Sequence, residues 1–119
     1  MYDPTETELS YSYLFKLQEE CKKLHWALLG GWAVYLQVQD NYQKAFGKEY
    51  LRSRDIDIYI DAAYQDKLAE VIQKLEFVAS AYHFRYELIY GREEKRIFST
   101  EEAKKKPIFN LIYLFLDVF

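Results

Sequence analysis

Two aspartates, Asp55 and Asp57, stand two positions apart in the run 55–60, whose other residues are isoleucines and one tyrosine. In a strand, residues i and i+2 point to the same face, so the two carboxylates are expected to lie side by side, about 7 Å apart. The three isoleucines then point to the opposite face and into a core. Like charges at this spacing repel unless a cation lies between them, so the pair indicates a metal site.

A third acid, Asp117, stands in the apolar run 108–119. A carboxylate in such surroundings is strongly disfavoured unless it is paired or bound to a metal. If the strand of Asp117 lies beside 55–60, the three acids converge. Two structural alternatives stay open for the acid pair: charges on an edge strand that deter aggregation, or ion pairs with Arg52, Arg54 or Arg85.

Two adjacent glycines, Gly30 and Gly31, separate the apolar run 25–29 from a helical pattern that starts at Trp32. Glycine lets the backbone approach a ligand closely, and a helix N-terminus offers unpaired amides and a positive dipole. The position therefore suits a phosphate. The alternative is a tight turn that packs under Trp32.

The remaining periodicities predict the elements that must position these residues. Helical spacing is expected at 5–24, 32–46 and 64–78, and strands at 25–29, 55–60, 82–90, 95–99 and 108–119. The segment 101–106 is expected to be a charged loop. The order predicts an α/β (α+β) fold in which a mixed β-sheet is packed by helices.

Composition limits the class of protein. The chain has 119 residues, which is one domain, and a net charge of −3, which gives no electrostatic support for non-specific nucleic-acid binding. Its single cysteine excludes an internal disulfide and a cysteine-based metal site. The longest apolar run, 108–119, is too short to cross a bilayer. We expect a cytoplasmic protein without a membrane segment.

Together, the motifs Leu28-Leu29-Gly30-Gly31-Trp32 and Ser53-Arg54-Asp55-Ile56-Asp57-Ile58, followed by a later strand with Asp117, resemble the DNA polymerase beta-like nucleotidyltransferase superfamily. The Gly-Gly-Trp-Ala motif and the serine two residues before the first aspartate resemble most the motifs of the antibiotic and abortive-infection-toxin nucleotidyltransferases. The resemblance covers residues 25–60 well, and 80–119 only through Asp117. The 24 positions from Gly31 to Asp55 exceed the spacing of compact members and imply an extended helix or an inserted loop at 40–51.

The resemblance implies a nucleotidyltransferase-like fold over residues 1–119 and a site for each part of the substrate. Asp55 and Asp57 would bind two Mg²⁺ (or Mn²⁺) ions, and Asp117 would share one of them and help to activate the attacking hydroxyl. Gly30, Gly31 and Ser53 would hold the triphosphate. The implied reaction transfers a nucleoside monophosphate from an NTP to an unknown hydroxyl acceptor.

The chain ends inside an apolar run, and the helical acceptor-binding domain that many relatives carry after the catalytic one is not seen. We therefore expect either the first domain of a longer protein or a subunit that completes itself in a homodimer or with a partner chain. This observation also leaves an alternative open, in which the domain keeps the fold but is a non-catalytic, antitoxin-like binding or regulatory module. In a third alternative the acids simply pair with arginines in a plain α/β scaffold.

Overall fold

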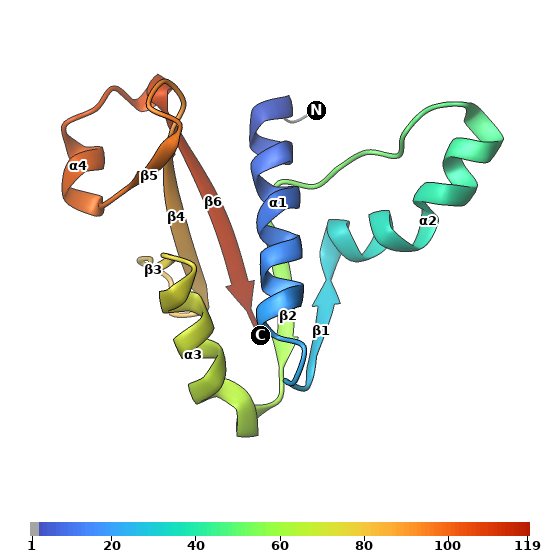
Figure 1. Cartoon of the computed structure of the whole chain (residues 1–119), viewed down its shortest axis with the longest axis horizontal. Coiled ribbons are helices and arrows are strands. Elements are labelled where there is room, and N and C mark those ends of the chain that lie inside the picture. The colour runs from blue at the N-terminus through green and yellow to red at the C-terminus, as the bar shows by residue number, and fades with distance from the viewer. Residues whose placement is uncertain (1–2) are drawn as a thin grey trace.

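The computed structural model describes residues 3–119, and within them six strands form one mixed sheet (Figure 1). The strands are β1 (Trp26–Leu29), β2 (Ile56–Ile60), β3 (Val78–Ala79), β4 (Arg85–Gly91), β5 (Arg96–Phe98) and β6 (Leu111–Val118). Their order is β1-β2-β6-β4-β3, and β5 also pairs with β4. The pair β2–β6 is parallel and the other pairs are antiparallel. The expected mixed sheet packed by helices is confirmed.

The helices are α1 (Pro4–Glu20), α2 (Gly30–Phe46), α3 (Gln65–Lys74) and α4 (Thr100–Lys104), with 3-10 turns η1 (Ala62–Tyr64) and η2 (Ile108–Asn110). The first helix begins one residue before the expected start, because the Asp3 side chain accepts a hydrogen bond from the Thr5 amide (2.8 Å) and proline occupies the first turn. Gly47 ends α2 in the left-handed conformation, with φ of 69°.

One face of the sheet is closed by helices. Along β2 the three isoleucines are buried, as expected, and they share a core with Leu14 and Leu17 of α1 and with Leu68 and Ile72 of α3. Figure 1 shows α1 and α3 over this face, whereas α2 continues from the end of β1 and extends away to the right. On the other face Tyr59 and Tyr113 are 52% and 37% exposed. The acids of β2 and β6 alternate with the core residues, so they belong to this second, partly exposed face.

Two expectations for the C-terminal third are wrong. Residues 101–106 are not simply a charged loop, because Ser99 and Glu102 form a capping box with both hydrogen bonds at 3.1 Å, and α4 follows from it. The last strand begins at Leu111 and not at 108, because Asn110 is held in η2. Its side chain donates to Glu94 (2.8 Å) and accepts from the Glu93 amide (3.0 Å).

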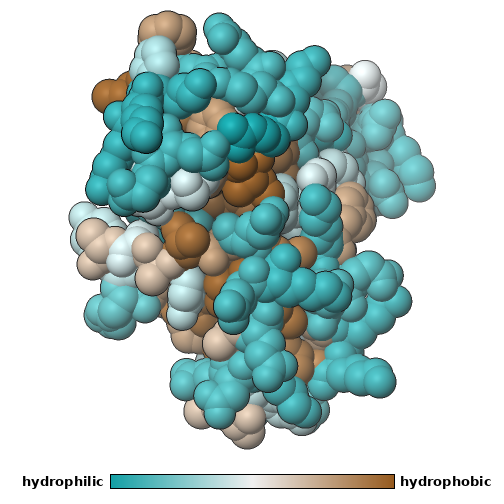
Figure 2. All heavy atoms as spheres, turned by 60° about the vertical axis from the view of Figure 1, so that its left-hand side comes forward, coloured by the Kyte–Doolittle hydropathy of each residue, from teal (hydrophilic) through white to brown (hydrophobic). Residues whose placement is uncertain are grey.

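Hydrophobic and hydrophilic side chains are interleaved on the surface. Figure 2 shows a broken band of hydrophobic atoms running between hydrophilic ones. Several large apolar residues are exposed, with Ile108 at 85% and Phe109 at 77%. Among residues 3–119, no helix has the length and apolar character that a membrane crossing requires.

A buried hydrogen bond joins α1 to α2. The indole Nε1 of Trp32 donates to Ser10 Oγ at 2.8 Å, and both side chains are fully buried. We expect Ser10→Ala to lower the free energy of unfolding by about 1–3 kcal/mol, because the indole N–H then has no acceptor. Urea denaturation measures this loss. The double variant Ser10→Ala/Trp32→Phe removes the donor as well. If the double variant loses more free energy of unfolding than the two single variants together, the explanation is contradicted.

Candidate functional site

Asp57 and Asp117 are brought together by the pairing of β2 with β6. They are register partners on neighbouring parallel strands, so their side chains leave the same face of the sheet. Asp55 lies immediately before β2 and is two positions from Asp57. Asp117 is buried at 6% exposure, whereas Asp57 is half-buried. The condition for convergence, that the strand of Asp117 lies beside 55–60, is therefore met.

The electrostatics of the cluster appear most clearly at Asp57. Burial raises the pKa of Asp57 above its usual value, and the negative charges of Asp117 and Asp55 raise the pKa further, whereas the charge of Arg85 lowers it. No ion pair or hydrogen bond joins the Asp57 side chain to another side chain among residues 3–119. A cation at this carboxylate would relieve both the repulsion and the missing partner.

The two glycines lie against this cluster. Gly30 is the first residue of α2, and its φ of 67° is in the left-handed region. A Cβ at Gly30 would overlap Asp57 Oδ2, and a Cβ at Gly31 would lie 2.8 Å from Ser53 Oγ. The left-handed φ favours glycine at Gly30, and a Cβ at either position would force the side chain of Asp57 or Ser53 to move away from the turn.

A hollow of about 390 Å³ opens beside the turn. Its lining includes Gly31, Ser53, Asp55 and Asp57, which are four of the six expected site residues. The remaining wall comes from α2 and from the segment before β2, namely Val34, Tyr50, Leu51 and Arg52. Val34, Tyr50 and Leu51 were not expected at the site, and Arg52 was named only as a possible ion-pair partner of the acids; the folding of the 47–54 segment against α2 brings this wall together.

Two of the three acids have arginine partners. Arg54 Nε lies 3.3 Å from Asp55 Oδ1, and Arg85 binds both oxygens of Asp117, with Nε at 2.8 Å and Nη2 at 3.0 Å. Arg52 instead pairs with Glu8 and Glu49. Over residues 3–119, no three or more His, Cys, Asp or Glu side chains form a group arranged to hold a metal ion. The structural alternative of acid–arginine pairing thus applies to Asp55 and Asp117.

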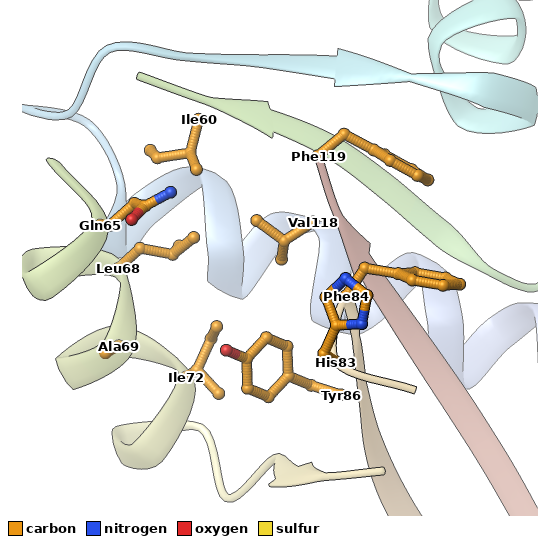
Figure 3. Close-up of a pocket in the computed structure, with 10 residues that line it drawn as sticks. All are labelled: Ile60, Gln65, Leu68, Ala69, Ile72, His83, Phe84, Tyr86, Val118 and Phe119. Atoms are coloured by element: carbon orange, nitrogen blue, oxygen red, sulfur yellow. The ribbon is translucent and has the colours of Figure 1, made fainter. Parts of the chain in front are cut away.

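A separate pocket of about 540 Å³ lies between α3 and the ends of β4 and β6 (Figure 3). Ile60 and Val118 contribute to its walls, and both alternate in sequence with the residues of the acid-bearing face. Figure 3 shows mainly apolar and aromatic side chains here, with Gln65 and His83 as polar members. It contains none of the expected site residues.

No family model, curated protein or solved structure matches this chain. The resemblance to nucleotidyltransferases therefore depends on the glycine and aspartate motifs alone, and it stays a prediction. What the structure adds is the physical proximity of those motifs.

Proposed function

We propose that this chain is a metal-dependent nucleotidyltransferase that transfers a nucleoside monophosphate from an NTP to a hydroxyl acceptor. The proposal depends most on the surroundings of Asp57. This residue is the register partner of Asp117, lies within contact distance of Gly30, and lines an open hollow. Carboxylates and a glycine-lined helix start within one hollow are what a metal and a triphosphate together need.

Asp55 and Asp57 are the proposed ligands of Mg²⁺ or Mn²⁺. The donor set fits such an ion, since both acids line the hollow and supply hard oxygen ligands, and Asp57 has no protein partner among the described residues. Magnesium usually completes its shell with water and substrate phosphates, so two carboxylates suffice. A bound divalent ion would stabilise charge on the entering and leaving oxygens.

The phosphate side of the site is assigned to Gly30, Gly31 and Ser53. The first amides of α2 receive no side-chain cap from the described part of the chain, and the 17-residue helix directs its positive end to this point.

In the reaction, the acceptor oxygen forms a bond to the α-phosphorus while the bond to pyrophosphate breaks. The proton of the acceptor passes to a carboxylate; we assign this role to Asp117, which can take it only after its ion pair with Arg85 has opened. The cytoplasmic location belongs to this proposal, as does the identity of the acceptor as a hydroxyl.

Binding of NTP with metal is the first test. At a hundredfold excess over Kd, a ligand that binds only the folded state adds about 2.7 kcal/mol of stability. For a domain of this size, we expect a rise in Tm of about 10 °C with NTP and Mn²⁺ together. Differential scanning fluorimetry with NTP alone, Mn²⁺ alone and both gives the comparison. If no combination of NTP with Mg²⁺ or Mn²⁺ moves the Tm, the proposal is wrong.

A second candidate function has one observation in its favour. Because both oxygens of Asp117 are bound to Arg85, the third acid is already neutralised by the protein itself. This arrangement would suit a non-catalytic, antitoxin-like module that keeps the fold and binds a second copy or a partner chain. Sedimentation velocity combined with an assay of pyrophosphate release separates the two, since a monomer that turns over NTP would contradict a purely partner-binding role.

A further inference from the structure

Arg85 is the residue on which the state of Asp117 depends. It is the register partner of Asp117 on β4, just as Asp57 is its register partner on β2, so Asp117 lies between a cation and an anion on the same sheet face. The guanidinium binds both carboxylate oxygens in the two-pronged geometry that makes such pairs strong.

Aromatic rings hold the guanidinium in place. Its central carbon lies 4.4 Å from the ring centroid of Phe115, and the rings of Tyr82 and Phe84 are 5.6 and 5.9 Å away. Cation–π contacts of this kind favour the charged guanidinium where it stands. Asp117 is 9% exposed at its side chain and Arg85 25%, so water screens the pair weakly. The ion pair is therefore a built feature of the sheet and not a surface contact.

A carboxylate whose two oxygens both accept hydrogen bonds from a guanidinium is a poor ligand for a second cation, because its charge is already balanced. Within the same cluster, Asp55 has a contact of 3.3 Å to Arg54, and Asp57 has no pairing partner in the described chain. The three acids are thus unequal as ligands: Asp57 is open, Asp55 is partly engaged, and Asp117 is fully engaged.

We propose that Arg85 is a positioning residue that masks Asp117, so that a divalent cation binds through Asp55 and Asp57 while the Arg85–Asp117 pair stands. This inference rests on the proposed function, because it concerns the same metal site. It adds one condition to that site: Asp117 becomes a metal ligand or a proton acceptor only when its ion pair with Arg85 opens. Removing the guanidinium should therefore tighten metal binding.

The probe is Mn²⁺ alone, titrated into the full chain and followed by electron paramagnetic resonance of the free ion. We expect Arg85→Met to bind Mn²⁺ about tenfold more tightly than the wild type, because a nearby positive charge is lost and Asp117 is released. Arg92→Met is the matched control, since Arg92 pairs with Asp3 and Glu6 and not with the site acids. Its affinity should equal that of the wild type.

Arg85→Met leaves Asp117 as an unpaired buried acid, which can prevent folding. A double variant keeps the test decisive in that case. Arg85→Met/Asp117→Asn removes the whole pair and leaves the local net charge unchanged, so its Mn²⁺ affinity should stay within about threefold of the wild type. A loss of tenfold or more in the double variant would mean that Asp117 is already a ligand, and would overturn the inference. An Arg85→Met affinity equal to or weaker than that of the wild type would overturn it as well, and would leave the proposed function intact. If neither the wild type nor any variant binds Mn²⁺, the proposed function and the inference both fall.

Discussion

An Asp57→Asn variant is expected to lose the rise in Tm that NTP and Mn²⁺ give to the wild type, and to keep its fold. Asp57 is the acid without a protein partner in the described chain, and it adjoins the glycine turn, so it is the central ligand of the proposed site. Removal of even an outer-shell partner typically lowers metal affinity 10–100-fold, so loss of a direct ligand should lower it by about 100-fold or more. Fluorimetry across a Mn²⁺ series at fixed NTP measures the loss.

Without metal, the same variant should be at least as stable as the wild type. Because burial and the charges of Asp117 and Asp55 raise the pKa of Asp57 in the folded state, its ionised form opposes folding. The folded protein holds that proton more tightly than the unfolded chain does, so this group adds stability as the pH falls through its raised pKa toward 3.8. Asp57→Asn removes the repulsion at neutral pH, and we expect a Tm unchanged or up to about 3 °C higher.

Asp40→Asn is the control for Asp57→Asn. Asp40 is exposed on α2, away from the hollow, so its amide variant changes the net charge equally without touching the site. It should keep the full response to NTP and Mn²⁺. A variant Asp57→Asn that responds as Asp40→Asn does would remove Asp57 from the proposed metal site.

The strand of Asp57 could be predicted from sequence because its information is local. Alternation of acids and isoleucines over 55–60 fixes both the element and its buried face, and the structure confirms both. The change from strand to helix at Gly30 and Gly31 could be predicted as well, although α2 begins at Gly30 and not at Trp32. The close approach of these glycines to Asp57 and Ser53 could not be predicted, because it depends on the pairing of β1 with β2.

The environment of Asp117 could not be predicted in the same way. Its neighbours come from strands at distant positions in the chain, and their registers bring Asp57 to one side and Arg85 to the other. Sequence reasoning named Arg85 only as one of three candidate partners for Asp55 and Asp57. Helix α4 was missed for a different reason, because it buries only Ala103 and depends on a capping box more than on an apolar face.

Gly30→Ala is expected to be the most damaging single substitution at the site. The left-handed φ of 67° costs a residue with a Cβ about 1–2 kcal/mol, and the overlap of that Cβ with Asp57 Oδ2 adds about 1–3 kcal/mol of overpacking. The free energy of unfolding should therefore fall by about 2–5 kcal/mol. Binding of NTP with Mn²⁺ should fall with it, since the acid and the turn can no longer both keep their places. Urea denaturation and the fluorimetric titration measure the two effects.

Gly47→Ala separates backbone strain from this overlap. Gly47 has nearly the same φ, 69°, and a Cβ there meets nothing within 4 Å. It should lose only the 1–2 kcal/mol or so that the left-handed conformation costs, and it should bind NTP and Mn²⁺ as the wild type does. The double variant Gly30→Ala/Asp57→Ala then tests the contact itself, because shortening Asp57 removes the atom that the new Cβ would strike. Recovery of the overpacking part in the double variant would locate the damage between these two residues, whereas strictly additive losses would show that the turn and the acid are independent.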